Sequence, residues 1–437
     1  MRDDLGIRKS SKQRIVIVGG GFAGLKLAKK LSKKKYQVVL LDRNNYHTFQ
    51  PLLYQVAMGE LEPDSIAYPL RKSIHGSSLV FRMADVLRIN PEDQTLNTSQ
   101  GKLKFDQLII ASGSKANYFG NDNIAKYAFS LKSIPGALDI RSWIFQSLES
   151  AVLENKAEAS INIVIVGGGP TGVEIAGALS DLKNHVLPKD YQELSFSRFK
   201  IYIIEGSKKI LNAMSNEASV HSRRYLEKMG VEIKTGHLVK DFDGARVLLS
   251  TGEMIPTNIL IWSAGVTGNP VEGIAESSVH RNMRYKVDRY NRILGYENIY
   301  AVGDVASMED PFEKNHPMLA PVAIQQATNL ARNLNIRSAK PWKKFRYSNK
   351  GVLATVGRNK ALADFGALHL RGFFAWLIWV FVHLMTLVGF RNRLIVFINW
   401  LISYISFDSA IHLIIRPLKI KPIEGNNTAV KKDYVST

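Results

Sequence analysis

Two stretches of the chain share one pattern of hydrophobic and polar positions. In each, a short run of β-branched residues is followed by glycines and then by a helical spacing of apolar residues, starting at Arg14 and at Asn162. A short, fully apolar run bounded by turn residues is typical of a strand buried in a parallel sheet. The pattern therefore predicts two strand–turn–helix units, as expected for an α/β protein.

Both predicted turns contain a complete G-x-G-x-x-G spacing. The glycines are, in chain order, Gly19, Gly21, Gly24, Gly167, Gly169 and Gly172. In a dinucleotide-binding turn the first glycine allows the turn, the second lets the backbone approach a pyrophosphate, and the third lets the helix pack on the strand. Tight packing alone explains a single match equally well. Two matches, each between a predicted strand and a predicted helix, favour two dinucleotide sites.

An acidic residue ends the strand predicted after each glycine turn. Asp42 lies 21 residues after Gly21, whereas Glu205 follows a longer gap in which residues 182–197 read as an insertion. A carboxylate at this position can accept hydrogen bonds from both ribose hydroxyls. The alternative, that both acids merely end exposed strands, is the weaker interpretation beside two complete motifs.

Three further apolar runs end in small residues. Their ends are Ala111, Ser112 and Gly113, then Ala264 and Gly265, then Gly303 and Asp304. Each run alone fits an ordinary core strand. Their order after the two glycine motifs supports two bound dinucleotides, and two such sites in one chain suggest a flavin together with a nicotinamide cofactor.

Cysteine usage narrows the chemistry. The chain has 437 residues, enough for two or three domains, and contains no cysteine. This excludes disulfide scaffolds, thiolate zinc sites, iron–sulfur clusters and flavoenzymes that use a redox-active cysteine pair. We expect no metal site.

Charge and tryptophan are concentrated at the C-terminal end. The formal net charge is +20, and the region from Pro341 onward holds 14 Lys or Arg against 4 Asp or Glu, with four of the six tryptophans. A basic excess is attracted to anionic surfaces. Basic charge beside tryptophan and long apolar runs is more typical of a membrane surface than of nucleic acid.

The same region contains an apolar run that is long enough to raise the question of a membrane span. Residues 372–390 include no Asp, Glu, Lys or Arg, and about 20 apolar residues suffice to cross a bilayer. Basic residues flank both ends, so the charges give no orientation.

Helical spacing favours helices that lie on the membrane instead. One face of the first helix carries Trp376, Trp379, His383 and Thr386, and one face of the next carries Asn392, Asn399, Ser403 and Ser406. We therefore expect two amphipathic helices in the membrane interface. The alternative is a buried helical hairpin or a dimer interface.

Together these motifs resemble the two-dinucleotide-binding-domain flavoproteins and, more closely, the type II NADH dehydrogenases, which are single-chain, non-pumping NADH:quinone oxidoreductases. The resemblance spans residues 14–415 and rests on the segments that begin at Val38, Gly169, Ile299, Ala320 and Ala375. It implies an α/β fold with two Rossmann-like domains of the glutathione-reductase type and a C-terminal helical, membrane-associated region. The implied domains are an FAD-binding domain at 12–150 and 285–340, an NADH-binding domain at 151–284, and a membrane-anchoring region at 341–437.

The resemblance also implies which residues hold the two cofactors. Non-covalent FAD would be held by Gly19, Gly21, Phe22, Ala23, Gly24, Asp42, Arg43, Val86, Ala111, Gly113, Gly303, Asp304, Ala320, Pro321 and Val322. NADH would be held by Gly167, Gly169, Gly172, Glu205, Ala264 and Gly265. Glu205 would repel a 2′-phosphate and so favour NADH over NADPH, although Lys208 and Lys209 follow closely and moderate this preference.

Three polar residues are implied to act near the flavin. Glu174 would couple hydride transfer to proton uptake by the quinone, unless it is only a carboxylate stabilised by the helix dipole. Gln325 and Gln326 would contact the quinone, although a solvated or capping role also fits Gln325. Pro321 stands where many relatives have a glutamine, which removes one quinone-contacting side chain.

The function implied is hydride transfer from NADH to FAD and then transfer of two electrons to a membrane quinone, without proton pumping. The partners would be the quinone, an anionic bilayer surface and a second copy in a homodimer, with no nucleic acid. The location would be peripheral, on the cytoplasmic face of a bacterial inner membrane. A sulfide:quinone oxidoreductase needs cysteines, and a soluble ferredoxin reductase would not carry this tail. A flavoprotein that binds NADH as a signalling ligand stays open.

Overall fold

The structure is a computed structural model, and it describes residues 3–74, 79–154, 161–308, 315–336, 340–406, 412–423 and 427–434. The chain forms two compact units, each assembled from three segments. Unit 1 comprises residues 1–48, 67–115 and 266–349, and unit 2 comprises residues 49–66, 116–265 and 350–437.

Unit 1 is built on a five-stranded parallel sheet in the order β21-β9-β1-β2-β5. The strands are β1 (Gln13–Val18), β2 (Tyr36–Asp42), β5 (Val80–Met83), β9 (Gln107–Ile110) and β21 (Ile299–Ala301). Because β1 lies at the centre, the glycine turn that follows it sits at the carboxyl edge of the sheet, where doubly wound folds bind ligands.

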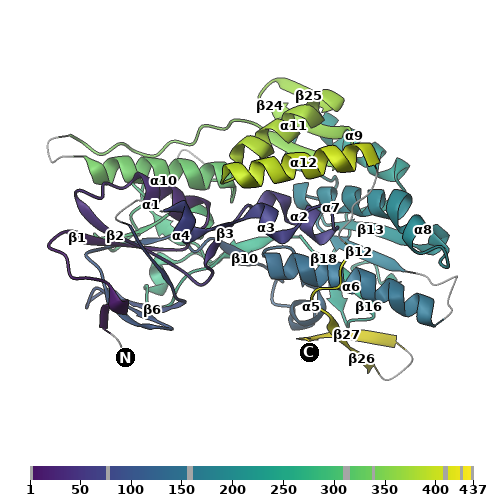
Figure 1. The fold of residues 1–437 in the computed structure, drawn as a ribbon, viewed down its shortest axis with the longest axis horizontal. Coiled ribbons are helices and arrows are strands. Elements are labelled where there is room, and N and C mark those ends of the chain that lie inside the picture. The colour runs from purple at the N-terminus through teal and green to yellow at the C-terminus, as the bar shows by residue number, and fades with distance from the viewer. Residues whose placement is uncertain are drawn as a thin grey trace. The chain divides into compact units, whose positions relative to one another are not determined.

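Both faces of this sheet are covered. One face carries α1 (Phe22–Lys30) and α10 (Ala320–Asn335), which pack side by side (Figure 1). The other face packs against the antiparallel sheet of β6 (Val86–Asn90), β7 (Thr95–Thr98) and β8 (Gly101–Lys104). Burial on both sides explains why β1 and β2 are nearly continuous runs of Val, Ile and Leu.

The remaining elements of unit 1 are short. They are β3 (Tyr46–Thr48), β4 (Ala67–Pro69), α4 (Leu70–Ser73), β20 (Tyr285–Val287) and β22 (Ala306–Met308). The chain passes between the units near β10 (Ser114–Ala116) and β19 (Val266–Gly268).

Unit 2 repeats the plan with a parallel sheet in the order β11-β18-β12-β13-β14. The strands are β11 (Phe129–Ser130), β12 (Asn162–Val166), β13 (Lys200–Glu205), β14 (Val231–Thr235) and β18 (Ile259–Trp262). The helices that accompany it are α2 (Leu53–Ala57), α3 (Pro63–Ile66), α5 (Asp122–Tyr127), α6 (Ile134–Leu153), α7 (Pro170–Asp181) and α9 (Asn216–Lys228). An antiparallel sheet of β15 (Val239–Phe242), β16 (Arg246–Leu249) and β17 (Met254–Pro256) packs on the strands.

The helix after the second glycine turn continues beyond α7. It passes through a π-helical turn (Leu182–Val186) into α8 (Leu187–Asp190). The first half of the predicted insertion at residues 182–197 is therefore an extension of this helix. A π turn widens the helix locally and is frequent at functional sites.

The C-terminal segment of unit 2 begins as a sheet and continues as a helical hairpin. The antiparallel strands β23 (Val352–Gly357), β24 (Lys360–Phe365) and β25 (Leu368–Gly372) lead into α11 (Phe373–Thr386) and α12 (Phe390–Ser406), and β26 (Leu418–Ile423) pairs with β27 (Asn427–Tyr434) at the end. β23 packs closely on α7, since a Cβ on Gly177 would lie 2.4 Å from the carbonyl oxygen of Val356. The side chain of Asn392 donates to the carbonyl oxygens of Asp64 and Ser65, each at 3.0 Å.

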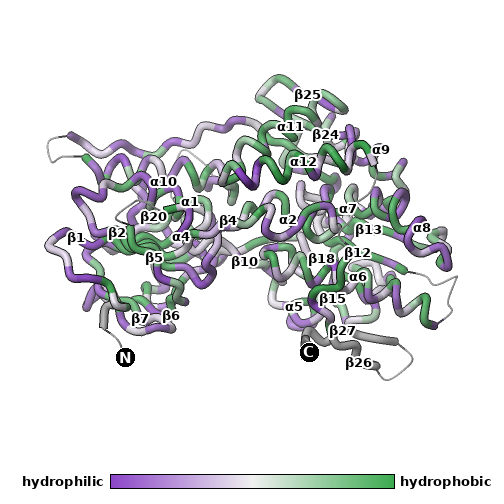
Figure 2. Tube along the Cα trace, viewed as in Figure 1, coloured by the Kyte–Doolittle hydropathy of each residue, from purple (hydrophilic) through white to green (hydrophobic). Residues whose placement is uncertain are grey.

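The two helices of the hairpin expose an apolar face. Figure 2 shows both as mostly hydrophobic, and the side chains of Phe374, Phe381 and Ile405 are 73%, 63% and 72% exposed. Trp379 and Asn392, which belong to the two predicted polar stripes, are instead buried. The prediction of two short helices is confirmed, but these two stripe residues lie inside unit 2, where they find partners, and the purely apolar face lies outside. Within the part of the chain that the structure describes, no helix is both long and apolar enough to cross a membrane.

The two units divide the chain at residues that differ from the predicted domain boundaries. Residues 116–150 lie in unit 2, because β11 joins the second sheet beside β18 and α6 packs against it. Residues 266–284 lie in unit 1, and residues 49–66 and 350–437 belong to unit 2. The sequence motifs identify the strands that carry them, but they do not identify the two-residue strand β11 or the sheet that it joins.

Candidate functional site

The two glycine turns have nearly the same backbone geometry. Gly19 has φ +105° and Gly167 has φ +104°, in a region that favours glycine. A Cβ on Gly24 would lie 1.8 Å from the carbonyl oxygen of Gly19, and a Cβ on Gly172 would lie 1.9 Å from that of Gly167. The first and third glycines of each motif are therefore required by the protein itself.

The middle glycines differ from the others because nothing in the protein requires them. Gly21 has φ −69° and Gly169 has φ −72°, which any residue adopts. A Cβ on either residue would have no described protein atom within 4 Å. Such a Cβ would point into open space at a helix N-terminus, where a pyrophosphate is bound in dinucleotide sites. This open space fits a dinucleotide in each unit.

The two predicted ribose-binding acids make equivalent hydrogen bonds in the two units. One Asp42 oxygen accepts the N–H of Gly20 at 2.5 Å, and the other accepts the N–H of Asn44 at 2.7 Å. In unit 2, Glu205 accepts the N–H of Gly168 at 2.6 Å and that of Ser207 at 2.7 Å. Each carboxylate thus clamps its glycine turn, and the remaining lone pairs of its oxygens can accept ribose hydroxyls. Burial raises the pKa of Asp42, and the N–H donors oppose this shift.

In unit 1 the remaining small residues meet at the same edge of the sheet. Gly19 lies against Ala111, because a Cβ there would be 2.4 Å from the Ala111 carbonyl oxygen. Gly303 has φ +78°, and its site is bordered by Ala23 and Ala323. Neighbouring Asp304 accepts the hydroxyl of Ser114 at 2.7 Å.

Other predicted FAD residues lie on the elements around this edge. Phe22 starts α1, Gly113 follows β9, Val86 starts β6, exposed Arg43 follows Asp42, and Ala320, Pro321 and Val322 form the first turn of α10. The proline causes no strain there, because its missing N–H would have no partner inside the helix.

In unit 2 the residues Ala264 and Gly265 line the second turn. A Cβ on Gly167 would lie 2.7 Å from Cα of Ala264, and a Cβ on Gly265 would lie 3.1 Å from the ring of Phe119. Phe119 is 68% exposed and meets Trp262 edge-on with ring centroids 6.3 Å apart. Sequence analysis did not identify this aromatic residue, since no motif contains it.

The two predicted quinone-contacting glutamines already have partners. Gln326 is buried and accepts the N–H of Gly303 at 2.7 Å, so it holds the loop that carries Asp304. The amide of Gln325 pairs with the backbone of Ser348 in both directions, each at 3.0 Å. Their contact with a quinone stays a prediction.

A separate cavity of about 340 Å³ lies wholly within unit 2. Its walls come from α2 with the turn after it, from α7 and its π-helical extension, from the β23–β24 hairpin, and from α11 and α12. Three tryptophans line it, Trp376, Trp379 and Trp400. The cavity therefore joins the helix of the second glycine turn to the exposed hairpin.

One face of the α7 helix supplies a polar wall of this cavity. Glu174, Ala178, Asp181 and His185 all line it, at spacings of four, three and four residues. Glu174 and Asp181 are half-buried. The predicted catalytic residue thus belongs to a row of polar groups and is not isolated.

Burial favours the protonated form of two glutamates that line the cavity. Burial raises the pKa of Glu174 to about 8, and the N–H of Thr355 and the side chain of Trp379 oppose this shift. Burial, followed by the charge of Asp181, raises the pKa of Glu60 to about 8. Both carboxyls are therefore largely protonated at neutral pH, in contrast to ordinary glutamates.

Asp181 has both a raised pKa and several cationic neighbours. Burial raises its pKa, and the effect is opposed by the N–H of Arg358, by the charges of Lys360 and His185, and by the guanidinium of Arg358. The Arg358 N–H donates to the Asp181 carboxylate at 3.3 Å. Asp181 is thus an acid of this cavity with cationic groups beside it.

A hydrogen-bonded chain holds Tyr54 in the opposite wall. The indole N–H of Trp400 donates to the Gln55 side chain at 2.9 Å, and the Gln55 amide donates to the Tyr54 hydroxyl at 3.2 Å. Burial and the charges of Glu174, Glu60 and Asp181 raise the Tyr54 pKa far above its usual range. The Tyr54 hydroxyl keeps its proton and can donate it in a hydrogen bond.

The indole of Trp379 is fixed in place. Its ring stacks on His383 with centroids 4.1 Å apart, and His383 Nδ1 contacts the Trp379 carbonyl oxygen at 2.8 Å. Burial lowers the pKa of His383 to about 4, so this ring is neutral. The Trp379 side chain is also a hydrogen-bond partner of the Glu174 carboxyl.

Glu60, Asp181 and Tyr54 were missed by sequence analysis. The seven-residue spacing from Glu174 to Asp181 is the one signal that was available, because it places both acids on one helix face. Glu60 lies in an irregular turn after α2, so no periodicity singles it out.

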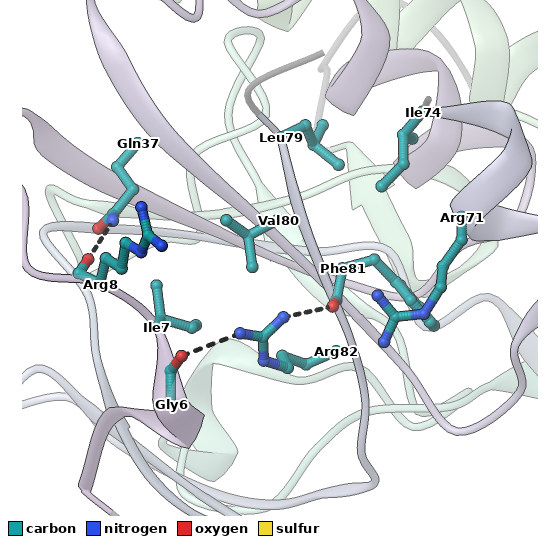
Figure 3. Close-up of a pocket in the computed structure, with 10 residues that line it drawn as sticks. All are labelled: Gly6, Ile7, Arg8, Gln37, Arg71, Ile74, Leu79, Val80, Phe81 and Arg82. Atoms are coloured by element: carbon teal, nitrogen blue, oxygen red, sulfur yellow. Dashed lines mark hydrogen bonds between the residues drawn. The ribbon is translucent and has the colours of Figure 1, made fainter. Parts of the chain in front are cut away.

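A second, larger hollow of about 440 Å³ lies in unit 1 between the N-terminal segment and the edge of the sheet (Figure 3). Arg82 donates to the carbonyl oxygens of Leu5, Gly6 and Phe81, and Gln37 donates to that of Arg8. These bonds fasten the N-terminal segment to the sheet. We therefore assign this hollow to packing and not to a reaction.

Comparisons with known proteins agree with this organisation. The family model of the pyridine nucleotide-disulphide oxidoreductases matches residues 13–327, and that of the NDH2 C-terminal domain matches residues 349–406. A type II NADH:quinone oxidoreductase of Mycobacterium tuberculosis is 33% identical over 420 residues, covering 90% of this chain and 89% of that protein.

Two solved structures show the same fold. NDH2 from Plasmodium falciparum, in complex with NADH, has a TM-score of 0.83 at 23% identity and covers 90% of this chain and 99% of that chain. The sulfide:quinone oxidoreductase of Aquifex aeolicus has a TM-score of 0.67 at 18% identity and covers 96% and 98%. Because this chain has no cysteine, the second likeness extends to the fold and not to sulfide chemistry.

Proposed function

This chain belongs to the type II NADH:quinone oxidoreductases, and from that membership we propose how its parts divide the reaction. It oxidises NADH and reduces a quinone without pumping protons. Unit 1 binds FAD without a covalent bond, and unit 2 binds NADH. The cavity in unit 2 receives the quinone, and the helical hairpin meets the membrane.

FAD fits unit 1 for reasons of shape and charge. Its pyrophosphate would occupy the open space beside Gly21 at the N-terminus of α1, and its adenosine ribose would bond to Asp42. The remaining FAD residues are those predicted from the sequence, with Gly303 and Asp304 held in place by Gln326. When bound, the flavin accepts a hydride and passes on electron pairs.

NADH fits unit 2 by the same geometry. Its pyrophosphate would lie beside Gly169, and Glu205 would accept the ribose hydroxyls. A carboxylate at this position repels the extra phosphate of NADPH. The exposed ring of Phe119, beside Gly265, offers an apolar surface to the cofactor.

The quinone and the membrane are assigned to the C-terminal hairpin. The tryptophan walls of the cavity suit a flat aromatic head group. The exposed face of α11 and α12 offers Phe374, Phe381 and Ile405 to lipid, and Arg391 and Arg393 lie at the start of α12. Apolar burial with basic residues beside it is the physical basis of monotopic attachment to an anionic bilayer. We place this surface at the cytoplasmic face of a bacterial inner membrane.

One observation carries the proposal: two glycine turns with matched carboxylate clamps, each with open space at the middle glycine. Its test is the visible spectrum of the purified protein under anaerobic conditions. We expect an oxidised flavin spectrum that NADH bleaches and a short-chain quinone restores. A protein without bound flavin, or one that NADH leaves oxidised, would contradict the assignment.

The signalling alternative gives a different result in the same experiment. A flavoprotein that uses NADH only as a ligand would bleach slowly, and quinone would not restore the spectrum at catalytic rates. Sustained NADH consumption with added quinone therefore separates the two functions.

A further inference from the structure

We propose that Glu60 and Asp181 form, together with Glu174, a proton relay along the wall of the cavity that supplies protons to the quinone. This inference rests on the proposed NADH:quinone activity and assigns a task to two acids that the reaction itself does not name. The acids share this cavity with three tryptophans and with the helices that form its walls.

The overall reaction requires one proton from outside the cofactors. NADH gives up a hydride, which carries two electrons and one proton. A quinone gains two electrons and two protons to become a quinol, with one O–H bond formed at each oxygen. The flavin cycle therefore supplies both electrons, and the second proton must reach the quinone through protein groups or water.

The fold places all three acids on the lining of one cavity. Glu174 and Asp181 lie two turns apart on one face of α7. Glu60 faces the same cavity from the turn after α2, and its N–H is bonded to the Gln55 carbonyl oxygen at 2.8 Å. Electrostatic coupling joins Glu60 to Asp181, and Tyr54 to all three acids.

The outer end of the series lies at Asp181. His185 follows it by one turn, lines the cavity and is exposed to solvent. The other charged and titratable groups that line the cavity, taken from all the elements around it, are Tyr54, His185, Arg358, Lys360 and Tyr404. Cations beside Asp181 favour its ionised form, whereas Glu60 and Glu174 hold protons more firmly. Asp181, next to the exposed His185 and to Lys360 in the cavity lining, is therefore assigned as the entry point of the relay.

The inner end of the series lies at Glu174. Its carboxyl has the Trp379 side chain as a hydrogen-bond partner, and Trp379 also lines the cavity. A quinone carbonyl oxygen near Glu174 would be placed where a proton can be delivered.

The test compares two acceptors in the full-length, FAD-loaded protein. Glu60→Gln and Asp181→Asn are each assayed with a short-chain quinone, which needs protons, and with ferricyanide, which takes electrons only. We expect quinone turnover to fall about tenfold at pH 8, with a smaller loss at pH 6, because general acid catalysis contributes about 10²–10⁴-fold where it operates. Ferricyanide turnover should stay within about twofold of wild type, as should both rates of the control Glu193→Gln, an exposed acid outside the cavity.

A readout that does not depend on turnover accompanies the assay. Infrared difference spectra between acidic and alkaline pH should show a protonated carboxyl band in wild type that weakens in Glu60→Gln. Asn at position 181 keeps an oxygen that can accept the Arg358 N–H, so this variant should fold.

Three outcomes would overturn the relay. The first is unchanged quinone turnover and pH profile in both variants. The second is equal loss with both acceptors, which is the result expected from a purely structural role. The third is a carboxyl band that does not change. If wild type itself fails to reduce quinone, the proposed function is wrong, and that result is read from the wild-type control alone.

Discussion

The helices that follow the two glycine turns start alike and then differ. At two, five and nine residues after the third glycine, the first helix segment has Lys26, Lys29 and Lys33, whereas the second has Glu174, Gly177 and Asp181. Lys26 and Lys29 face solvent on α1, while on α7 the glycine admits β23 and both acids line the cavity. The glycine turn thus provides a dinucleotide cradle in both units. The two units differ in what covers the helix beyond this turn.

The largest loss of cofactor binding is expected when the third glycine of either turn is substituted. Gly24→Ala should abolish FAD binding, because its Cβ would lie 1.8 Å from a backbone oxygen and neither group can move away cheaply. Clashes of this kind cost about 4 kcal/mol or more. Gly172→Ala has the same clash in unit 2, and it should spare the flavin spectrum while abolishing bleaching by NADH. Flavin content and stopped-flow bleaching measure the two effects.

The middle glycine provides the matched control. Gly21→Ala meets no described protein atom within 4 Å, so the protein should fold with wild-type thermal stability and lose affinity for added FAD only. Equal behaviour of Gly21→Ala and Gly24→Ala would show that the open space beside Gly21 is not a ligand site.

The next largest effect concerns the hairpin that covers α7. Changing Phe374, Phe381 and Ile405 together to Glu should lower binding to anionic vesicles at least 100-fold, since each apolar side chain contributes about 1.5–3 kcal/mol on burial. Ferricyanide turnover should not change, because these side chains are exposed to solvent and do not line the cavity. Vesicle co-sedimentation at two salt concentrations measures the loss.

Substitution is a cleaner test than removing the tail after Phe365. Such a truncation would remove β25 and the tryptophan walls of the cavity as well as the exposed face. A triple variant that still sediments with vesicles as wild type does would place the membrane contact elsewhere.

Part of the candidate site could be predicted from the sequence alone. The glycine spacing, Asp42 and Glu205 follow from local motifs, and the structure gives both acids the same backbone partners. Glu60 and Tyr54 could not be found in this way, because they face the cavity from a short helix and the turn after it. The Trp379 face of α11 was predicted to lie in the membrane interface, whereas this residue is buried in the protein. An amphipathic pattern separates the two faces of a helix, but it does not show which face packs on protein. Trp379 and His383 find their partners in unit 2 only after folding.

The two carboxylate clamps allow a smaller and sharper test. Glu205→Ala should reduce the preference for NADH over NADPH by about 10–100-fold, because bonds to a charged acceptor contribute about 1.5–3 kcal/mol. Asp42→Ala should weaken FAD retention and leave the coenzyme preference as it is. The ratio of kcat/KM for the two coenzymes measures the first effect. An unchanged ratio in Glu205→Ala would mean that another residue reads the ribose.

The smallest expected effect is on stability, and it tests the acidic lining of the cavity that α7 shares with the turn after α2. A carboxyl whose pKa is about 8 when folded and near 4.5 when unfolded keeps its proton in the folded state between these values. The folded state then binds more protons, so the free energy of unfolding falls as pH rises from about 5 to 8. Glu60→Gln removes this dependence and should make the FAD-loaded protein more stable than wild type at pH 9, by about 1–2 kcal/mol after screening by the half-exposed surroundings. Thermal unfolding at pH 6 and pH 9 measures it, with Glu193→Gln as the control that keeps the wild-type slope. If Glu60→Gln and wild type lose stability equally with rising pH, Glu60 is ionised in the folded protein, and the acidic wall of the cavity stores no proton at that position.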